Sequence, residues 1–534
     1  MNDSPDEKTN SSTHLERTLL LSIAFMSGAT LMALEILGFR VIDRTFGSAL
    51  RETSVVISVF LGAMSVGYWL GGRSGDRHPR PLAMAVPLLI AAAAIMVIPF
   101  FNDPLANAVY ESALPRGLHS LIVTTVLFAI PAAFLAAAYP IAVRILTKDR
   151  TEAGSVAGMT SAISTAGSIV GSVATGFWLI DFFQSVNLTL EAIALLSLML
   201  AVSAAMLDDR FTQSFPDRFQ LHALAGRVSV TLVLALLIAG WLAARLISGP
   251  LIAGSGPDFG TRVLLERDSP YHHIIVRDTN RVRTLEFGRI WQSSMKLDDP
   301  LGRGLKYTSY FHAPMMLHAN PERVLFIGLG GGTGPRQFLH DYPQVVIDVV
   351  EIDQAVVEIA AEYFGVSETD RLRIHAEDAR AFVKRSESKW DVIIIDAYTS
   401  NRYGATIPRH LTTREFFDLC AEKMNPGGLI LFHVFSPRDA PISRAISKTL
   451  LMVFPEQIVF GGSEILASAS PFEGSRDELI ASLRQRVALR LPHREYLQKE
   501  MGNIAETPLQ TRGLPVLRDD YAPVDSLIRS YRDR

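Results

Sequence analysis

The chain has 534 residues, of which 49% are hydrophobic, and its formal net charge is −3. This length accommodates two or more domains, and the apolar content favours a membrane section. The balanced charge gives no sign of a nucleic-acid partner. The single cysteine, Cys420, excludes an intramolecular disulfide and any metal site built from several cysteines.

The N-terminal half is dominated by long apolar segments. Residues 1–16 are polar and are predicted to be a disordered tail. Residues 17–248 are predicted to form a transmembrane helical domain, because seven segments there approach or exceed the roughly 20 apolar residues that cross a bilayer. The segments are 18–39, 53–72, 82–101, 119–146, 155–180, 186–207 and 228–248. The first lacks a convincing cleavage site, so we interpret it as an anchor.

Two features inside these segments stand out. Glu35 and Glu191 fall at membrane depth, where an acid is costly and is by default a functional candidate. For Glu35 we favour a structural ion pair with Arg40, and a substrate or proton path is the alternative. Pairs of glycines four residues apart permit close approach of helices, although glycine is also simply common in membrane helices. The pairs are Gly67 and Gly71, Gly154 and Gly158, and Gly167 and Gly171.

Beyond Gly249 the long apolar runs give way to short segments. Residues 273–276 and 284–287 predict short strands of a small β-unit. Strands then alternate with helices, which indicates a mostly parallel α/β sheet of Rossmann type with helices on both faces. The predicted strands are 323–327, 346–351, 372–375, 391–395 and 429–434, and the helices are 335–341, 354–363, 377–385, 412–424 and 441–453. This domain, 260–475, is followed by a helical tail, 476–534.

A glycine-rich turn follows the first strand of this alternation. Its glycines, Gly328, Gly330 and Gly332, let the backbone turn sharply and approach a ligand closely. The next strand ends in Glu351 and Asp353, about 20 residues on, which suits the hydroxyl pair of a ribose. The pattern therefore predicts a nucleoside site at the carboxyl ends of the strands.

Further acids follow the later strands. Asp378 follows the third strand and Asp396 ends the fourth, while Asp519 and Asp520 lie in the tail. A lone aspartate at a strand end is more often a helix N-cap than a catalyst. Several in successive register behind a glycine turn favour a functional site. The sequence shows no cluster of metal ligands.

Taken together, these residues resemble the spermidine synthase (polyamine aminopropyltransferase) family, which shares the fold of class I S-adenosylmethionine methyltransferases. The resemblance covers roughly 265–460. Beside the glycine turn and the acids, it is carried by 269–273, Gln292, Tyr307 and 318–321. The segments 165–171 and 519–523 are typical of a membrane-fused branch of the family.

The resemblance implies a role for each matched residue. Asp396 would accept a proton from an attacking amine, and Tyr307 would help to place that amine. Glu351 would bind the ribose hydroxyls. The implied cofactor-binding residues are Gln292, Gly328, Gly330, Gly332, Glu351, Asp353, Asp378 and Ala379, and the further substrate candidates are His272, Tyr398, Asp519 and Asp520. The implied co-substrate is decarboxylated S-adenosylmethionine, or S-adenosylmethionine itself, with no metal.

Three departures from the family pattern concern the amine end of the site. Gly331 stands where the family usually has an aspartate in the glycine turn. Thr399 replaces a second aspartate after Asp396, and Ser309 stands in an element that usually carries an acid. Polycations need acids, so these losses weaken the case for putrescine and for decarboxylated S-adenosylmethionine. Asp519 and Asp520 are candidates to replace one of the missing acids.

The leading hypothesis is a membrane-anchored aminopropyltransferase that acts on an amine such as putrescine. The alternatives are a methyltransferase that uses S-adenosylmethionine on a small or membrane-associated acceptor, and a nucleoside-sensing transporter-like protein. The implied partners are a small-molecule amine and a lipid bilayer, with no nucleic acid, and a homodimer stays open.

Basic loops after the second, fourth and sixth apolar segments place those loops and the N-terminus in the cytoplasm. We expect a multi-pass protein of the cell membrane with its catalytic domain also in the cytoplasm, where adenosyl cofactors are made. Seven full crossings would place that domain outside. One segment is therefore a candidate for a re-entrant or interfacial stretch, and 119–146, which contains Pro131 and Pro140, is the best placed.

Overall fold

The computed structural model divides into two compact units. One comprises residues 1–251 with 268–270, and the other comprises 252–267 with 271–534. The residues that it describes are 5–47, 50–209, 212, 238, 240, 261–288, 290–302, 304–401, 404–461, 463–505 and 509–532.

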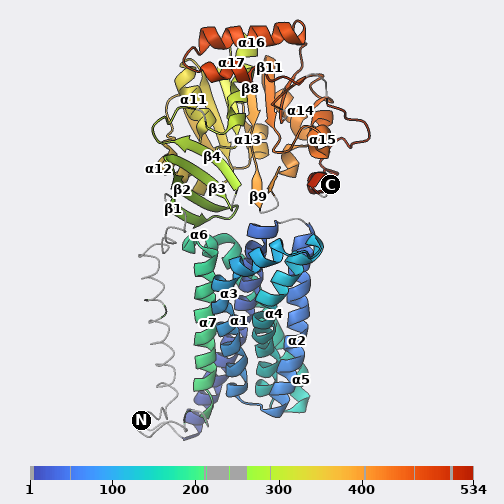
Figure 1. Ribbon diagram of the computed structural model, residues 1–534. Coiled ribbons are helices and arrows are strands. Elements are labelled where there is room, and N and C mark those ends of the chain that lie inside the picture. The colour runs from blue at the N-terminus through green and yellow to red at the C-terminus, as the bar shows by residue number, and fades with distance from the viewer. Residues whose placement is uncertain are drawn as a thin grey trace. The chain divides into compact units, whose positions relative to one another are not determined.

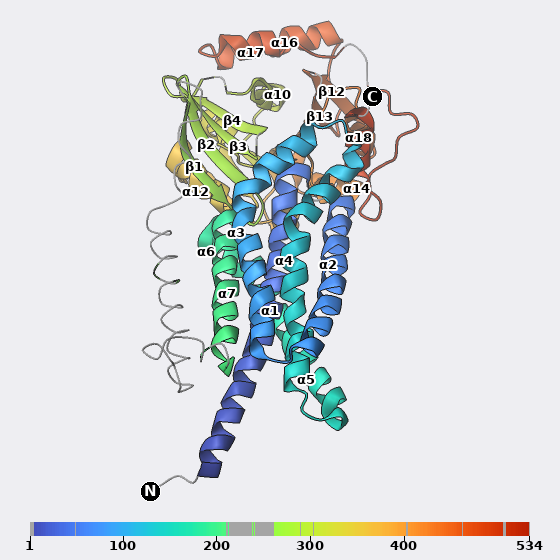
Figure 2. The ribbon, with the colours of Figure 1, turned by 60° about the horizontal axis from the view of Figure 1, so that its bottom comes forward.

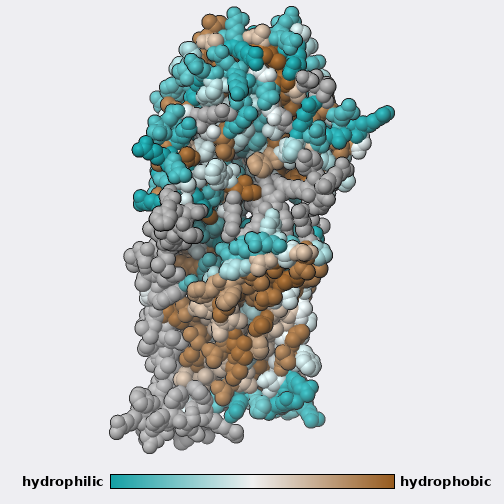
Figure 3. Space-filling view, in the orientation of Figure 1, coloured by the Kyte–Doolittle hydropathy of each residue, from teal (hydrophilic) through white to brown (hydrophobic). Residues whose placement is uncertain are grey.

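The first unit is a bundle of long helices that lie side by side (Figures 1 and 2). These are α1 (Pro5–Phe46), α2 (Leu50–Arg77), α3 (Pro81–Glu111), α4 (Arg116–Leu146), α5 (Ala153–Ala174) and α7 (Val186–Met206), with a π-helical turn η2 (Thr175–Leu179) and the short α6 (Ile180–Phe183) between the last two. Within the described residues, six helical stretches are long and apolar enough to cross a membrane. A broad band of hydrophobic side chains covers the face of the bundle that Figure 3 shows.

Two predictions for this unit are corrected. Helix α1 begins at Pro5, so the described part of the polar segment 1–16 is helical and not disordered. Proline is favoured in the first turn of a helix, and the apolar segment behind it extends the helix without a new nucleation step. Segment 119–146 lies in one continuous helix, α4, which contains both prolines and is long enough to cross a bilayer. The seventh apolar segment, 228–248, lies outside the described residues apart from 238 and 240.

The predicted ion pair between Glu35 and Arg40 is also corrected, because Arg40 pairs with a different acid. Arg40 pairs with Asp43, at 3.7 Å between Nη1 and Oδ2. Residues three apart share one helix face, whereas residues five apart do not, so Glu35 points away from Arg40.

The glycine pairs divide into packed and unpacked ones. A Cβ at Gly67 would lie 2.1 Å from the carbonyl oxygen of Ala133 in α4, and one at Gly171 would lie 2.0 Å from that of Ala29 in α1. A Cβ at Gly154 or Gly158 would meet no described atom within 4 Å. The glycine spacing therefore marks close helix packing in α2 and in the second half of α5, but not at the start of α5.

The second unit contains two main sheets. A four-stranded sheet has the order β1 (Thr261–Asp268), β2 (His273–Thr279), β3 (Val282–Phe287) and β4 (Ile290–Lys296). A seven-stranded sheet has the order β12-β13-β11-β8-β5-β6-β7. Its strands are β5 (Arg323–Ile327), β6 (Val346–Glu351), β7 (Leu372–Ala376), β8 (Trp390–Ile395), β11 (Met424–His433), β12 (Glu456–Phe460) and β13 (Glu464–Ser468).

Helices cover both faces of the larger sheet (Figure 1). They include α11 (Thr333–Asp341), α12 (Gln354–Phe364), α13 (Ala379–Arg385), α14 (Arg414–Glu422) and α15 (Pro441–Leu450). The C-terminal segment adds α16 (Arg476–Arg490), α17 (Glu495–Glu500) and α18 (Val524–Arg532), and a small hairpin is formed by β9 (Thr399–Asn401) and β10 (Gly404–Thr406). Alternate residues of β5 enter two separate apolar clusters, Val324 and Phe326 on one face and Leu325 and Ile327 on the other. This two-sided burial explains the uninterrupted apolar run that predicted the strand.

The strand order creates a switch point beside the glycine turn. Strands β5, β6, β7, β8 and β11 are parallel, with β6 on one side of β5 and β8 on the other. Ligands of open α/β sheets bind outside the carboxyl ends of the strands at such a point. The parallel strands, the helices α11 to α14 between them and α15 after the last of them confirm the predicted fold class. Strands β1, β4, β12 and β13 and the β9–β10 hairpin were not predicted. Strand β11 begins at Met424, before the predicted strand 429–434, with a register shift before Leu429.

Candidate active site

A cavity of about 260 Å³ lies at the switch point. This volume approaches the lower end of the roughly 300–1,000 Å³ of small-molecule sites. The predicted site residues in its lining are His272, Gln292, Tyr307, Gly328, Gly330, Glu351, Asp378, Ala379, Asp396 and Tyr398. Gly332, Asp353, Asp519 and Asp520 are not among the described lining residues. The fold thus gathers residues from 272 to 398 around one space.

Three glycines of the turn, Gly328, Gly330 and Gly332, have a positive φ that side chains oppose, and the first and last are also closely packed. Gly328 has a φ of +100°, and a Cβ there would lie 2.1 Å from the carbonyl oxygen of Asp396. Gly332 has a φ of +66° and precedes α11, and its Cβ would meet Val366 at 2.3 Å. The first glycine therefore lets β5 and β8 close around the cavity, whereas Gly332 serves the packing of the turn and not the ligand directly.

Glu351 holds the glycine turn in place from the end of β6. Its Oε2 accepts a hydrogen bond from the Leu329 amide at 3.0 Å, and its Oε1 accepts one from the Asp353 amide at 3.0 Å. The side chain is buried, and this burial raises the pKa of Glu351 to about 7, although the two backbone hydrogen bonds oppose the rise. Each carboxylate oxygen keeps a lone pair for a hydroxyl donor.

The affinity for an adenine nucleoside is expected to fall as the pH drops from 8 to 6. In the predicted role of Glu351, ribose hydroxyls would donate to the ionised carboxylate, and a pKa of about 7 leaves most Glu351 side chains protonated at pH 6. The dissociation constant for 5′-methylthioadenosine should therefore be about tenfold higher at pH 6 than at pH 8. Calorimetric titration checks this. Glu351→Gln should bind weakly and equally at both pH values, and a wild-type affinity independent of pH would contradict the assignment.

Asp378 and His410 lie on the other side of the nucleoside half. Asp378 caps α13 by accepting from the Ala381 amide at 2.8 Å, and its Oδ2 lies 2.8 Å from Nε2 of His410. Ala379, the first residue of α13, also lines the cavity. Asp353 caps α12, accepting from the Ala355 amide at 3.0 Å, and it is 1% exposed. In the structure Asp353 therefore has a capping role, and its contact with the cofactor stays a prediction.

Asp396 and Tyr307 form the polar centre of the remaining half. Tyr307, in the 3-10 turn η4 (Lys306–Phe311), donates its hydroxyl to Oδ2 of Asp396 at 3.1 Å. Burial raises the pKa of Asp396 above its usual value, whereas the charge of His433 and the hydrogen bond from Tyr307 act in the opposite direction. Burial also raises the pKa of the Tyr307 hydroxyl well above its usual value, so the tyrosine stays a donor. Asp396 is thus held as a hydrogen-bond acceptor in a protected setting.

A histidine–glutamate pair, not predicted from the sequence, lies behind this centre. The His433 ring stacks on Tyr307, with centroids 3.9 Å apart and an interplanar angle of 4°. Its Nδ1 lies 3.1 Å from Oε1 of Glu464, which is 1% exposed. Tyr398 donates its hydroxyl to the carbonyl oxygen of His433. The pair therefore fixes the positions of both cavity tyrosines and places a buried acid near Asp396.

The position of Gly331 has no room for a side chain. Its amide donates to Oγ of Ser293 at 2.8 Å. A Cβ at Gly331 would lie 2.8 Å from Cβ of Ser293 and 3.0 Å from the ring of Phe364. These two neighbours occupy the space that an aspartate side chain would need. The surrounding packing therefore favours glycine at position 331.

The tail acids do not replace the missing carboxylate. Both oxygens of Asp519 accept from Arg380 at 2.6 Å, and Oδ1 also accepts from Thr413 at 2.7 Å. Asp520 is exposed. Asp519 and Asp520 are not among the described lining residues of the cavity, and Asp519 ties the tail to α13, because the Arg380 guanidinium forms a two-pronged pair with it.

Comparisons with known proteins agree with this arrangement. Residues 306–442 match the family model of the spermine/spermidine synthase domain. A polyamine aminopropyltransferase from Vibrio vulnificus is 33% identical over 183 residues, which is 33% of this chain and 60% of the relative. A probable polyamine aminopropyl transferase from Bifidobacterium longum is 27% identical over 285 residues, 50% of this chain and 62% of the relative.

The chain thus spans about 60% of the length of these relatives. Among solved structures, the spermidine synthase from Thermotoga maritima aligns with 45% of this chain and 88% of its own, at 23% identity and a TM-score of 0.36. The family match falls on the strands and turns that build the cavity. Residues 306–442 of this chain thus match a spermine/spermidine synthase domain, and the chain is similar to polyamine aminopropyltransferases over this Rossmann-like α/β sheet.

Proposed function

We propose that this protein is a membrane-anchored aminopropyltransferase. It transfers an aminopropyl group from decarboxylated S-adenosylmethionine to an amine such as putrescine. The observation that carries the proposal is the hydrogen-bonded pair of Asp396 and Tyr307, which lies in the same cavity as the nucleoside-binding turn and Glu351.

The chemistry requires two parts that the cavity supplies. The amine must lose a proton as it attacks the carbon next to the sulfonium, and Asp396 accepts that proton while Tyr307 keeps the carboxylate oriented. The sulfonium is already a good leaving group, so the remaining acceleration comes from positioning the two substrates. Glu351, Asp378 and Ala379 hold the nucleoside at one end, which leaves the propyl carbon facing Asp396.

The acceptor end of the cavity has fewer acids than the family pattern. The buried pair of His433 and Glu464 affects the charge at this end. Glu464 raises the pKa of Asp396 through its charge, whereas His433 lowers it. The glutamate supplies a negative charge behind Tyr307 and Tyr398, which favours a cationic acceptor in front of them. We therefore expect an amine acceptor, with putrescine as the simplest example.

Methyl transfer from S-adenosylmethionine is the second candidate, and Gly331 favours it. An aminopropyl donor carries a free ammonium, for which the family uses an aspartate at this position. The packing of Ser293 and Phe364 leaves no space for that acid. A donor with a neutralised amine, such as the zwitterionic end of S-adenosylmethionine, has less need of it.

Calorimetry on the full chain in detergent separates the two candidates. The titrants are S-adenosylmethionine and its decarboxylated form, each with and without putrescine, followed by mass spectrometry of the products. Tighter binding of the decarboxylated donor, together with an aminopropylated product, supports the proposal. Tighter binding of S-adenosylmethionine with a methylated product replaces it by methyl transfer.

We further propose that the six long helices cross the cell membrane and that the catalytic unit lies on the cytoplasmic side. The support is their length and apolar composition, the hydrophobic band in Figure 3, and the basic residues after α2 and α4. Labelling of single introduced cysteines with a membrane-impermeant reagent in a Cys420→Ala background tests the side.

A further inference from the structure

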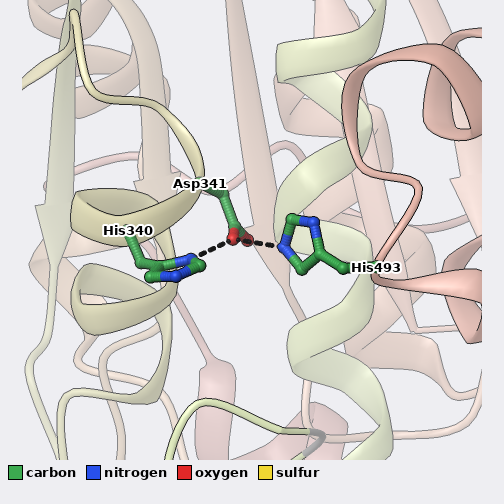
Figure 4. A group of neighbouring side chains, drawn as sticks. All are labelled: His340, Asp341 and His493. Carbon is green, nitrogen blue, oxygen red and sulfur yellow. Dashed lines mark hydrogen bonds and ion pairs between the residues drawn. The ribbon is translucent and has the colours of Figure 1, made fainter.

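Three potential metal ligands meet at one end of α11, far along the helix from the glycine turn where it begins. His340 and Asp341 close the helix, and His493 comes from the turn between α16 and α17. Nδ1 of His340 and Nε2 of His493 each lie 2.9 Å from Oδ1 of Asp341 (Figure 4). All three donor atoms lie within 4.8 Å of one another.

We propose that His340, Asp341 and His493 form a binding site for a transition-metal dication of the zinc type. Two imidazoles and one carboxylate are ligands that such ions prefer. Bonds of about 2.0–2.2 Å to a shared ion place tetrahedral donor atoms roughly 3.4 Å apart. The two nitrogen–oxygen contacts need to open by only about half an ångström to admit it. This proposal is independent of the proposed function.

The surroundings hold the carboxylate and leave the imidazoles accessible. The side chain of Asp341 is fully buried, and Arg494 donates from Nε to Oδ2 and from Nη2 to Oδ1, the latter at 3.2 Å. These two contacts hold the carboxylate, with Oδ1 also facing the two histidines, as outer partners commonly orient metal ligands. The side chains of His340 and His493 are 53% and 48% exposed. An ion can therefore enter from solvent, and water can complete its coordination.

The ring geometry also suits a shared ion. The two imidazole rings are T-shaped, with centroids 5.6 Å apart and an interplanar angle of 74°. Both point a nitrogen at Oδ1 from different directions (Figure 4). A bound ion needs the nitrogen that faces Oδ1 to carry no proton, so each neutral imidazole would hold its proton on the other nitrogen.

The site would fasten the C-terminal helices to the sheet domain. Arg494 also donates to the carbonyl oxygen of Leu301 at 2.7 Å, and Arg490, at the end of α16, donates to that of Met315 at 2.9 Å. The metal would add a cross-link to these hydrogen bonds across a gap of 152 positions in sequence. The guanidinium of Arg494 repels a dication, which favours moderate affinity and a role in stability.

The test is calorimetric titration of the full chain with ZnCl₂ in detergent, after removal of any histidine tag and of bound metal by a chelator. One saturable site is expected. His340→Ala and His493→Ala should each weaken binding at least about tenfold. His375→Ala is the matched control, because His375 lies 3.6 Å from one carboxylate, Asp348, in a pair outside the three-residue group. Its zinc affinity should equal that of the wild type.

A second reading uses Co²⁺, whose visible absorption reports coordination by protein ligands. The wild type should develop the absorption and the two histidine variants should lose it. The inference is overturned if the wild type shows no saturable site, or if both histidine variants bind zinc as tightly as the wild type. Asp341→Asn is unsuitable as the primary variant because it would leave the buried Arg494 without its partner.

Discussion

Asp396→Asn is expected to lower kcat by about 10²–10⁴-fold, the range that a positioned general base contributes. Asparagine keeps the shape of the side chain, and its carbonyl oxygen can still accept the hydrogen bond from Tyr307. It cannot accept the proton of the amine. In the proposed function the nucleoside binds at Glu351 and the glycine turn, so the dissociation constant for the donor should stay within about threefold of wild type.

Single-turnover kinetics with product analysis, beside calorimetry of the donor, measure both quantities. Tyr307→Phe serves as the companion variant, because it removes the hydroxyl that orients Asp396 but leaves the base in place. It should reduce kcat less than Asp396→Asn. A kcat for Asp396→Asn near that of the wild type would remove Asp396 from the mechanism, and a lost donor affinity would indicate a role in folding of the cavity instead.

The nucleoside half of the cavity could be predicted from the sequence because its residues are local. Gly328 and Glu351 occupy fixed places after consecutive strands, and parallel strands bring their carboxyl ends to one edge. Asp378 and Asp396 follow by the same rule. The resemblance to a known family added Tyr307 and Gln292, which come from outside the βα alternation.

The parts that escaped prediction depend on contacts between distant segments. Glu464 begins the antiparallel strand β13, and the pairing of this strand with β11 brings Glu464 to His433, 31 positions earlier. His493 reaches Asp341 across 152 positions. The sequence around Asp519 does not indicate whether this residue faces a substrate or Arg380. Only the fold shows that its partner is Arg380. Spacing rules describe residues on one element, so they carry no information on such pairs.

The second large effect on activity is expected from Gly328→Ala, because Gly328 lies where the turn after β5 meets the end of β8. Alanine at a positive φ costs about 1–2 kcal/mol of stability. At Gly328 its Cβ would in addition lie 2.1 Å from the carbonyl oxygen of Asp396, so the turn and the end of β8 must move apart. A displacement of about 1 Å at the reacting groups can cost about 10²-fold in rate. We therefore expect kcat/KM to fall at least about 10²-fold.

The control variant Gly365→Ala separates the effect of backbone strain at a positive φ from the effect of a steric clash at Cβ. Gly365 also has a positive φ, +68°, but a Cβ there meets no described atom within 4 Å. Thermal unfolding should show a similar backbone penalty in both variants, whereas donor affinity and kcat/KM should fall only in Gly328→Ala. Equal loss of activity in the two would mean that general destabilisation explains the effect. Loss confined to Gly328→Ala would tie catalysis to the contact between the glycine turn and the backbone of Asp396, because this contact sets the distance between the nucleoside and the base.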